Sequence, residues 1–355
     1  MSRSRPDRKS LSKRWGFFVR KCVGFVGNDE ATWMEKGCNF AAMKTRKYLE
    51  GGIEVSELGF GAWQLGVDSG WKAVSEGEAE RMIRTALDRG INFYDTAPNY
   101  GNGTSEERLG KVFKTLDRES IVVNSKFGRL DNGVVDFGSE HIRGSVERSL
   151  KRLNVDYLDS VIIHSPPREF LDGNKNDHYA ILERLQEEGK IKAYGASVDA
   201  EDEIKTLLNT TNAKVIQSFF NILHQDCVGA FDLVEAKGAT VIAKIPFDSG
   251  WLTGKYGADT QFTGVRDRWS REEITTRAGL VDRVKEMVAG HPSLVSAALT
   301  FCTSFDAVST VIPGAVSEAQ LLANLDAIQH KLDDDMVTRL QAFYQEEVRA
   351  LKLPW

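Results

Sequence analysis

The chain has 355 residues, of which 41% are hydrophobic and 27% are charged, and its formal net charge is −5 at pH 7. A chain of this length can bury a full-sized core, as one large α/β barrel or as two smaller domains. The mild acidity argues against a nucleic-acid binder, and no uncharged apolar run approaches the ~20 residues that cross a bilayer, so we expect neither a nucleic-acid partner nor a membrane partner.

The first 42 residues differ in composition from the rest of the chain. They are basic and carry Arg and Ser near the start, and their one apolar patch, residues 15–19, is followed at once by Arg20 and Lys21. A secretory signal would need a longer apolar run and a small-residue cleavage site. We therefore interpret residues 1–42 as a disordered or non-native extension, with an organelle transit peptide as the alternative, and residues 43–355 as the folded domain.

The four cysteines are too few and too scattered for a disulfide framework, and none of them belongs to a C-x-x-C pair. They are Cys22, Cys38, Cys227 and Cys302. This usage predicts reduced thiols and a cytoplasmic location.

From Tyr48 onward, patterns typical of short strands alternate with patterns typical of helices. Residues 48–55 predict a hairpin that turns at two glycines, and residues 57–61 predict a short strand. Residues 75–89 predict a helix, because Ser75 and Glu78 have the spacing of a capping box and apolar residues follow at helical spacing. Further strands are expected at residues 91–95, 121–126, 158–164, 191–197, 215–219, 240–244 and 308–313. Further helices are expected at residues 106–113, 139–153, 177–188, 201–209, 229–237, 293–303 and 318–329, with a last helix at about 333–347.

Strands that alternate with helices in this way cannot all be joined by tight hairpins, so the sheet is expected to be parallel and covered by helices. Eight such units in roughly 270 residues match a single (β/α)8 barrel. The alternative, an open doubly wound sheet, would normally show a dinucleotide fingerprint, and Gly101-x-Gly103 lacks the third glycine of that motif. We therefore predict an α/β protein, a (β/α)8 TIM barrel with an N-terminal β-hairpin and a C-terminal helix.

Four ionisable residues stand where the chemistry of such a barrel is expected, at the carboxyl ends of its strands. Asp95, Lys126 and His164 close three consecutive strands, and Tyr100 lies in the loop after the first of them. Each residue alone would more often be structural. Their convergence on the end of the barrel where the strands have their carboxyl ends, here called the mouth, indicates a catalytic centre.

The chemistry of these four side chains is specific. An ammonium beside a phenol lowers the pKa of the phenol from its ordinary value of ~10, and a buried lysine needs a carboxylate partner. Asp95, Lys126 and Tyr100 supply that series, so we expect Tyr100 to be a general acid with a lowered pKa. His164 adds a hydrogen bond that orients a carbonyl oxygen, and a hydride donor would complete a reduction.

Five segments carry a recognisable pattern: NFYDTAPNYG at 92–101, SKFG at 125–128, SLKRLNVDYLD at 149–159, IH at 163–164 and IPG at 312–314. Together they resemble the aldo-keto reductase family, as a short-loop, bacterial-type member, over about residues 47–329. The resemblance implies that Asp95, Tyr100, Lys126 and His164 form a catalytic tetrad with Tyr100 as proton donor. It also implies that NADPH binds in an extended pose across the barrel top and passes hydride reversibly to an aldehyde or ketone.

The resemblance further implies a set of cofactor-binding residues. Ser197 and Gln217 match the residues that hold the nicotinamide carboxamide, and Lys244 stands where the family has an aromatic residue stacked on the nicotinamide. The loop that would wrap the pyrophosphate contains Pro246, Phe247, Ser249, Gly250, Leu252, Gly254 and Lys255. The adenosine side would contain Ile312, Gly314, Gln320 and Asn324.

Three positions depart from the family pattern. Val198 replaces an Asn that follows Ser197, which removes one expected hydrogen bond. The ammonium of Lys244 would disfavour the cationic, oxidised cofactor, although its alkyl stem could still cover the ring. Val316 lies where many members carry a basic residue for the 2′-phosphate, and an unpaired phosphate is poorly held. We therefore expect NADP(H) as cofactor, with NAD(H) as the alternative.

The substrate is expected to be a small-molecule carbonyl compound or sugar. Trp63, Trp71 and Trp251 could line its pocket, with a satellite core cluster as the alternative for Trp71. No H-E-x-x-H or C-x-x-C motif is present, so we expect no metal site. Two other functions stay open: a cofactor-binding regulatory subunit with little turnover, and a scaffold that has lost cofactor binding.

Overall fold

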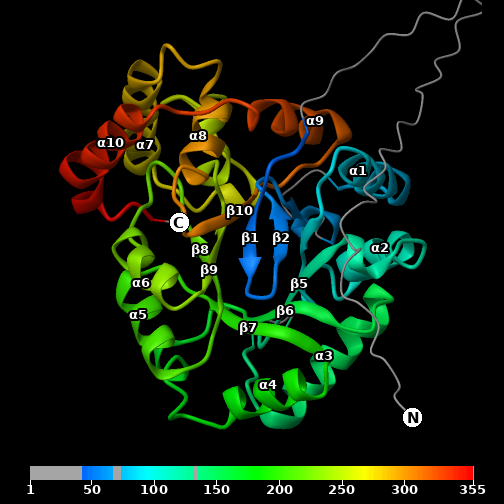
Figure 1. The fold of residues 1–355 in the computed structure, drawn as a ribbon. Coiled ribbons are helices and arrows are strands. Elements are labelled where there is room, and N and C mark those ends of the chain that lie inside the picture. Colours follow the sequence, from blue (N-terminus) through cyan, green and yellow to red (C-terminus); the bar gives the residue numbers. More distant parts are fainter. Residues whose placement is uncertain (1–41, 67–72, 131–133, 355) are drawn as a thin grey trace, which may run out of the picture. The chain divides into compact units, whose positions relative to one another are not determined.

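The computed structural model describes residues 42–66, 73–130 and 134–354, and its centre is a barrel of eight parallel strands (Figure 1). The strands follow one another around the barrel in sequence order, from β3 to β10. Parallel bridges between Leu58 and Val311 and between Gly61 and Gly314 join the last strand to the first and nearly close the ring. The predicted (β/α)8 fold is therefore confirmed. The strands are β3 Phe60–Gly61, β4 Phe93–Asp95, β5 Val122–Phe127, β6 Leu158–Ile163, β7 Ile191–Ser197, β8 Val215–Phe219, β9 Thr240–Lys244 and β10 Val308–Ile312.

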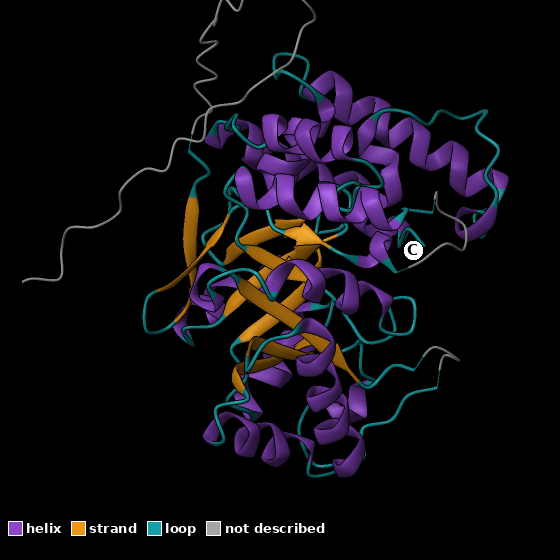
Figure 2. Cartoon of the chain, turned by 90° about the vertical axis from the view of Figure 1, so that its right-hand side faces the viewer, coloured by secondary structure: helices purple, strands orange, loops and turns teal. Residues whose placement is uncertain are grey.

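Helices surround the strands on the outside of the barrel (Figure 2). The first of them begins at its predicted cap, where the Ser75 hydroxyl accepts the Glu78 N–H at 3.2 Å. In the part of the chain that the structure describes, no helix combines the length and the apolar character that a bilayer span requires. The helices are α1 Glu76–Asp88, α2 Thr104–Phe113, α3 Ser139–Leu153, α4 His178–Glu187, α5 Glu201–Thr210, α6 Phe231–Ala236, α7 Arg271–Met287, α8 Leu294–Cys302, α9 Glu318–Ala327 and α10 Asp334–Phe343.

Helix α7 has no counterpart among the predicted elements. It starts at a capping box formed by Ser270 and Glu273, and its buried face repeats apolar residues at helical spacing. Arg277 lies on the same face and is fully buried. This charged residue interrupts the apolar pattern that would otherwise predict the helix from the sequence. The predicted last helix also differs, because α10 ends at Phe343 and continues as a π-helical turn, Tyr344–Val348.

An antiparallel hairpin, β1 Thr45–Leu49 and β2 Ile53–Ser56, packs into the amino-terminal end of the barrel. The Tyr48 ring makes an edge contact with Phe93 at 5.2 Å between ring centres, and its hydroxyl lies 2.6 Å from the Ser160 hydroxyl. These contacts join an interior cluster with residues of β4 to β10. The predicted hairpin is confirmed, and it leaves the carboxyl ends of the strands as the face where a site can form.

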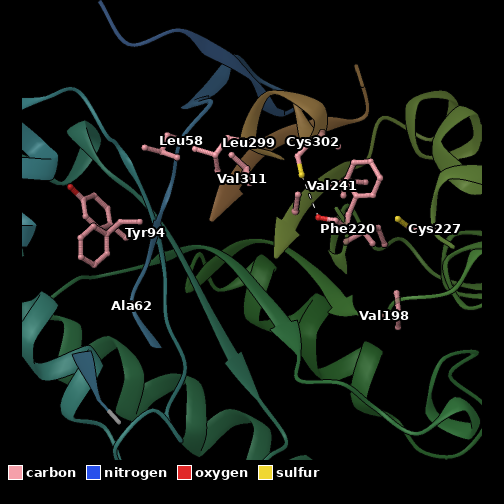
Figure 3. Packing of buried hydrophobic residues seen from close by; sticks show 14 of the residues in the cluster. Leu58, Ala62, Tyr94, Val198, Phe220, Cys227, Val241, Leu299, Cys302 and Val311 are labelled. Atoms are coloured by element: carbon pink, nitrogen blue, oxygen red, sulfur yellow. Dashed lines mark hydrogen bonds between the residues drawn. The ribbon is translucent and has the colours of Figure 1, made fainter. Parts of the chain in front are cut away.

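A second, larger core fills the layer between strands and helices (Figure 3). In it, the Cys302 thiol of α8 donates a hydrogen bond to the Phe220 carbonyl at 3.3 Å. Cys227 and Cys302 are both free and fully buried. Burial raises the pKa of the Cys227 thiol to about 12, so this thiol stays protonated and unreactive at neutral pH.

Candidate active site

The four predicted catalytic residues meet at the carboxyl ends of β4, β5 and β6. Asp95 ends β4, Lys126 lies near the end of β5, and His164 follows β6 directly. The Lys126 ammonium lies 2.8 Å from both carboxylate oxygens of Asp95 and 4.9 Å from the centre of the Tyr100 ring. The Tyr100 and His164 rings are nearly perpendicular, with 5.9 Å between their centres.

The Asp95 carboxylate is held by more than its lysine. Its Oδ1 atom also accepts hydrogen bonds of 2.7 Å from the side-chain amides of Asn124 and Gln217. Asn124 in turn accepts a hydrogen bond of 2.6 Å from Ser160, whose hydroxyl contacts Tyr48 of the hairpin. A continuous polar network therefore runs through the barrel interior and fixes the carboxylate beneath Lys126.

A close contact between two glycines places Tyr100. Gly101 has a left-handed backbone, with φ of 64°, and its Cα packs against the backbone of Gly66. A Cβ at Gly101 would collide with the Gly66 carbonyl, and a Cβ at Gly66 would collide with the Tyr100 carbonyl. Because only glycine tolerates both the backbone angle and the contact, the loop after β4 can press Tyr100 toward the mouth.

Burial shifts the pKa of the Tyr100 phenol in the direction opposite to the predicted one. Burial raises the pKa of Tyr100 above its ordinary value, and the Lys126 ammonium lowers that pKa only in part. The prediction of a lowered pKa is therefore wrong in direction for this structure, and Tyr100 is a protonated phenol at neutral pH. Burial alone would lower the pKa of Lys126, but Asp95 and Tyr100 outweigh it and raise that pKa, so Lys126 stays charged.

His164 is a neutral imidazole. Burial and the positive charges of Lys126, Lys244 and Arg129 hold the pKa of His164 well below its usual range. Its backbone N–H donates to the Phe127 carbonyl at 2.9 Å, which fixes the residue at the end of β6. A neutral ring at this place can donate one N–H to a carbonyl oxygen.

The residues expected at the nicotinamide lie at the ends of the next three strands. Ser197, Gln217 and Lys244 lie at or near the ends of β7, β8 and β9. The Lys244 ammonium donates to the Ser197 hydroxyl at 2.9 Å and pairs with Asp199 at 3.0 Å. Six consecutive strand ends thus line one mouth with polar side chains.

The loop after β9 has an unusual backbone. Ile245, Asp248 and Ser249 have positive φ angles of 58°, 47° and 56°, and Gly250 follows with 103°. The loop closes on itself through hydrogen bonds from the Asp248 N–H to the Ile245 carbonyl at 3.1 Å and from the Gly250 N–H to the Phe247 carbonyl at 2.9 Å. Pro246 is buried, whereas Gly254 is half-buried and Lys255 is exposed.

Two arginines that the sequence analysis missed reach this loop. The Arg266 Nε donates to the Ser249 carbonyl at 2.9 Å, and an Arg268 nitrogen lies 3.2 Å from the Ser249 hydroxyl. Both come from the segment between β9 and α7, for which no element is predicted. Arg266 and Arg268 lie 17 and 19 positions after Ser249 in the sequence, so no local motif links them to the loop. Only the presence of two basic residues close together could have drawn attention to them.

Other predicted residues lie in the core. Leu252 is fully buried and its N–H is bonded to the Phe247 carbonyl at 3.0 Å. Trp251 is fully buried against Tyr256, Phe262 and Trp269, so the suggestion that it lines a substrate pocket is wrong. Trp63 is half-buried in a short 3-10 helix after β3, and Trp71 lies outside the described residues.

The residues expected on the adenosine side surround the end of β10 and the start of α9. Gly314 is exposed just after β10, and Gln320 lies in the first turn of α9, where its side-chain oxygen accepts the Val316 N–H at 3.0 Å. Asn324 is buried one turn further along the helix. Ile312 points into the barrel interior, where it packs with the hairpin cluster.

No group of three metal-binding side chains occurs among the described residues. The polar groups that the described residues bring to the mouth are a phenol, two ammonium groups, an imidazole, a carboxylate, a hydroxyl and an amide.

A sequence model of the Aldo/keto reductase family matches residues 57–345. An NADH-specific methylglyoxal reductase from Escherichia coli is 29% identical over 314 residues, which cover 81% of this chain and 94% of that protein. A probable voltage-gated potassium channel subunit beta from Oryza sativa is 27% identical over 332 residues, which cover 86% of this chain and 98% of that protein. The holo form of an aldo-keto reductase from Bacillus halodurans superimposes with a TM-score of 0.72 at 28% identity, covering 84% and 96%.

A nearly closed parallel barrel with polar strand ends at one mouth is the framework of many enzymes. The chain belongs to the Aldo/keto reductase family, and this membership supports a general oxidoreductase role.

Proposed function

We propose that the chain is an NAD(P)H-dependent reductase of a small aldehyde, ketone or sugar carbonyl, acting in the cytoplasm with Tyr100 as general acid. The observation that carries the proposal is the buried contact of 2.8 Å between Lys126 and Asp95 directly beside Tyr100 and His164. A charged, fully paired ammonium next to a protonated phenol is suited to proton donation onto a carbonyl oxygen.

The side chains around the mouth fit a nicotinamide dinucleotide. Gln217 donates its amide N–H to Asp95, which leaves its oxygen to accept from a carboxamide. Arg266 and Arg268, which contact Ser249 of the loop after β9, bring positive charge that suits phosphates. When bound, the reduced cofactor supplies a hydride to the carbonyl carbon.

The residues of the chain move and hold the proton. His164, neutral, donates its ring N–H to the substrate oxygen and orients it toward Tyr100. The Tyr100 hydroxyl gives its proton to that oxygen as the carbon is reduced, and the phenolate left behind is stabilised by Lys126. Asp95 keeps Lys126 charged throughout, and Tyr100 regains its proton from water after the alcohol leaves.

The test of this function is a panel of aldehydes, ketones and sugars with NADPH and NADH, followed by the loss of absorbance of the reduced cofactor. We expect turnover of small carbonyl compounds. Absence of turnover with every carbonyl, together with tight cofactor binding, would reject the enzyme and favour the regulatory subunit. The similarity to the plant channel subunit beta is the observation behind that second candidate.

The pH dependence of the two directions should differ. Because burial raises the pKa of Tyr100, the proton donor is present at every pH below that raised value. We expect kcat for reduction to be flat between about pH 6 and pH 9, and kcat for alcohol oxidation, which needs the phenolate, to rise roughly tenfold per pH unit in that range. The low pKa of His164 predicts no inflection near its ordinary value of ~6.5. Steady-state kinetics in both directions measure this, and an oxidation rate that is flat with pH would contradict it.

Arg266 and Arg268 contact Ser249, in the loop expected to wrap the pyrophosphate, so we expect them to bind the phosphates of the cofactor. Changing both arginines to methionine should raise the Kd for NADPH by roughly 10²- to 10⁴-fold, because each of the two charge-assisted hydrogen bonds to phosphate is worth about 1.5–3 kcal/mol. The Kd for NADH should rise by a similar factor, because both cofactors contain the pyrophosphate. Arg271→Met is the control, since Arg271 lies on the surface and pairs with Asp259 at 2.8 Å. Fluorescence titration measures the constants, and values unchanged in the double variant would show that the arginines do not bind the phosphates.

A further inference from the structure

Lys244 occupies a defined place in the mouth. It is the last residue of β9, and only 17% of its side chain is exposed. Its ammonium is anchored twice, by donation to the Ser197 hydroxyl at 2.9 Å and by the ion pair with Asp199 at 3.0 Å. An ammonium held on both sides by short contacts is a fixed charge, unlike the head of a mobile surface lysine.

The charges that face the mouth do not cancel evenly. Lys126 is matched by the buried Asp95 carboxylate, with contacts to both oxygens. Asp199, the partner of Lys244, has half of its side chain exposed and also accepts the Phe219 N–H at 2.8 Å. Water therefore screens the carboxylate more than it screens the ammonium, which leaves a positive potential on the inner side of the pair. Arg129, whose Nε lies 3.3 Å from the His164 carbonyl, adds a charge of the same sign at the rim.

The two redox forms of a nicotinamide differ by one unit of charge at the ring. The oxidised ring is a cation and the reduced ring is neutral, so a fixed ammonium beside the mouth affects their binding unequally. We propose that Lys244, tuned by Asp199, is a redox-state selector that favours the reduced cofactor over the oxidised one. This inference rests on the proposed function, because it requires the nicotinamide to bind beside the tetrad.

The anchoring of Lys244 also orients Ser197. Because the ammonium donates to the Ser197 oxygen, the hydroxyl hydrogen is directed away from Lys244 and is left to donate to another acceptor. A carboxamide oxygen is such an acceptor. One lysine thus positions a hydrogen-bond donor and sets the charge of the same subsite, which compensates for the apolar Val198.

A charge at this place cannot change the equilibrium of the overall reaction, because a catalyst acts on both directions alike. It changes which form of the cofactor fills the enzyme at a given ratio of reduced to oxidised cofactor. It also weakens retention of the oxidised cofactor once the carbonyl has been reduced. Both effects favour turnover in the direction of reduction.

The ratio of the two dissociation constants tests the selector. For the full chain, the Kd of NADP+ and of NADPH is measured by tryptophan fluorescence and by calorimetry. Lys244→Met should lower the ratio Kd(NADP+)/Kd(NADPH) by roughly tenfold, mainly through tighter binding of NADP+, as expected for one charge at close range. Asp199→Asn should raise the same ratio, because it removes the screening carboxylate. Lys244→Arg should keep the ratio close to that of the unchanged protein.

Two controls separate the selector from a structural effect. Lys214→Met removes a lysine just before the start of β8, where its ammonium donates to the Lys237 carbonyl at 2.7 Å, and should leave the ratio unchanged. Melting temperatures identify any variant that fails to fold, and Lys244→Gln then replaces Lys244→Met. Binding of both forms with a ratio that is unchanged in Lys244→Met overturns the selector alone. The same pair of constants is measured for NAD+ and NADH, and binding of neither redox form of either cofactor by the unchanged chain overturns the proposed function and the selector with it.

Discussion

Replacing Tyr100 with phenylalanine should lower kcat for carbonyl reduction by roughly 10²–10⁴-fold, the range that a positioned general acid supplies. The phenol is the one group of the tetrad that is both protonated and able to release its proton beside a fixed ammonium, since the Lys126 nitrogen lies 4.9 Å from the ring centre. Removal of one hydroxyl leaves the ring and its contact with His164 in place. The Kd for NADPH should therefore stay nearly constant while kcat falls, as single-turnover and binding measurements can show.

Tyr94→Phe is the matched control for this variant. Tyr94 precedes Asp95 in β4, but its side chain faces the outer core and its hydroxyl donates to the Ile91 carbonyl at 3.1 Å. The same loss of a hydroxyl there should leave kcat unchanged. If Tyr100→Phe retains the kcat of the unchanged protein, the assignment of Tyr100 as proton donor is wrong, whatever the effect of the control.

The strands and the position of the tetrad could be predicted because they depend on local patterns. Strands β7, β8 and β9 begin and end at the predicted residues, since a strand buried on both faces reads as a short apolar run between polar or glycine-rich turns. The carboxyl ends of parallel strands share one face of the barrel. Asp95, Lys126 and His164 therefore follow from the strand ends alone.

The features of the fold and of the site that could not be predicted depend on burial and on contacts between residues far apart in the sequence. The pKa of Tyr100 depends on whether burial or the Lys126 charge has the larger effect. The degree of burial cannot be read from the spacing of residues in the sequence. The partner of Lys244 lies 45 positions earlier, at Asp199, and no motif links the two. Helix α7 is hidden for a related reason, because a charged residue such as Arg277 normally marks an exposed face.

Replacing Arg277, the buried arginine of α7, is expected to have a large effect on stability. Arg277 and Asp248 are both fully buried, and Arg277 Nε donates to Asp248 at 2.7 Å. Arg277 also donates to the Pro354 carbonyl at 2.8 Å and lies over the Trp269 ring, 5.0 Å from its centre. Arg277→Met should lower the free energy of unfolding by about 3–5 kcal/mol, because it leaves the buried Asp248 carboxylate without its permanent counter-charge and with only His224, 3.4 Å away, as an ionisable partner. Denaturant titration measures the change.

Two further variants decide whether the ion pair is responsible. Arg283→Met removes an arginine from the exposed side of the same helix, where it pairs with Glu347 at 2.9 Å, and should cost at most about 1 kcal/mol. Arg277→Met combined with Asp248→Asn should recover part of the loss, because asparagine carries no charge and tolerates the positive φ of 47° at this position. Such a recovery would show that the stranded carboxylate, and not the lost packing of the arginine stem, destabilises the single variant. An Arg277→Met protein no less stable than Arg283→Met would mean that the loop after β9 is held by other contacts.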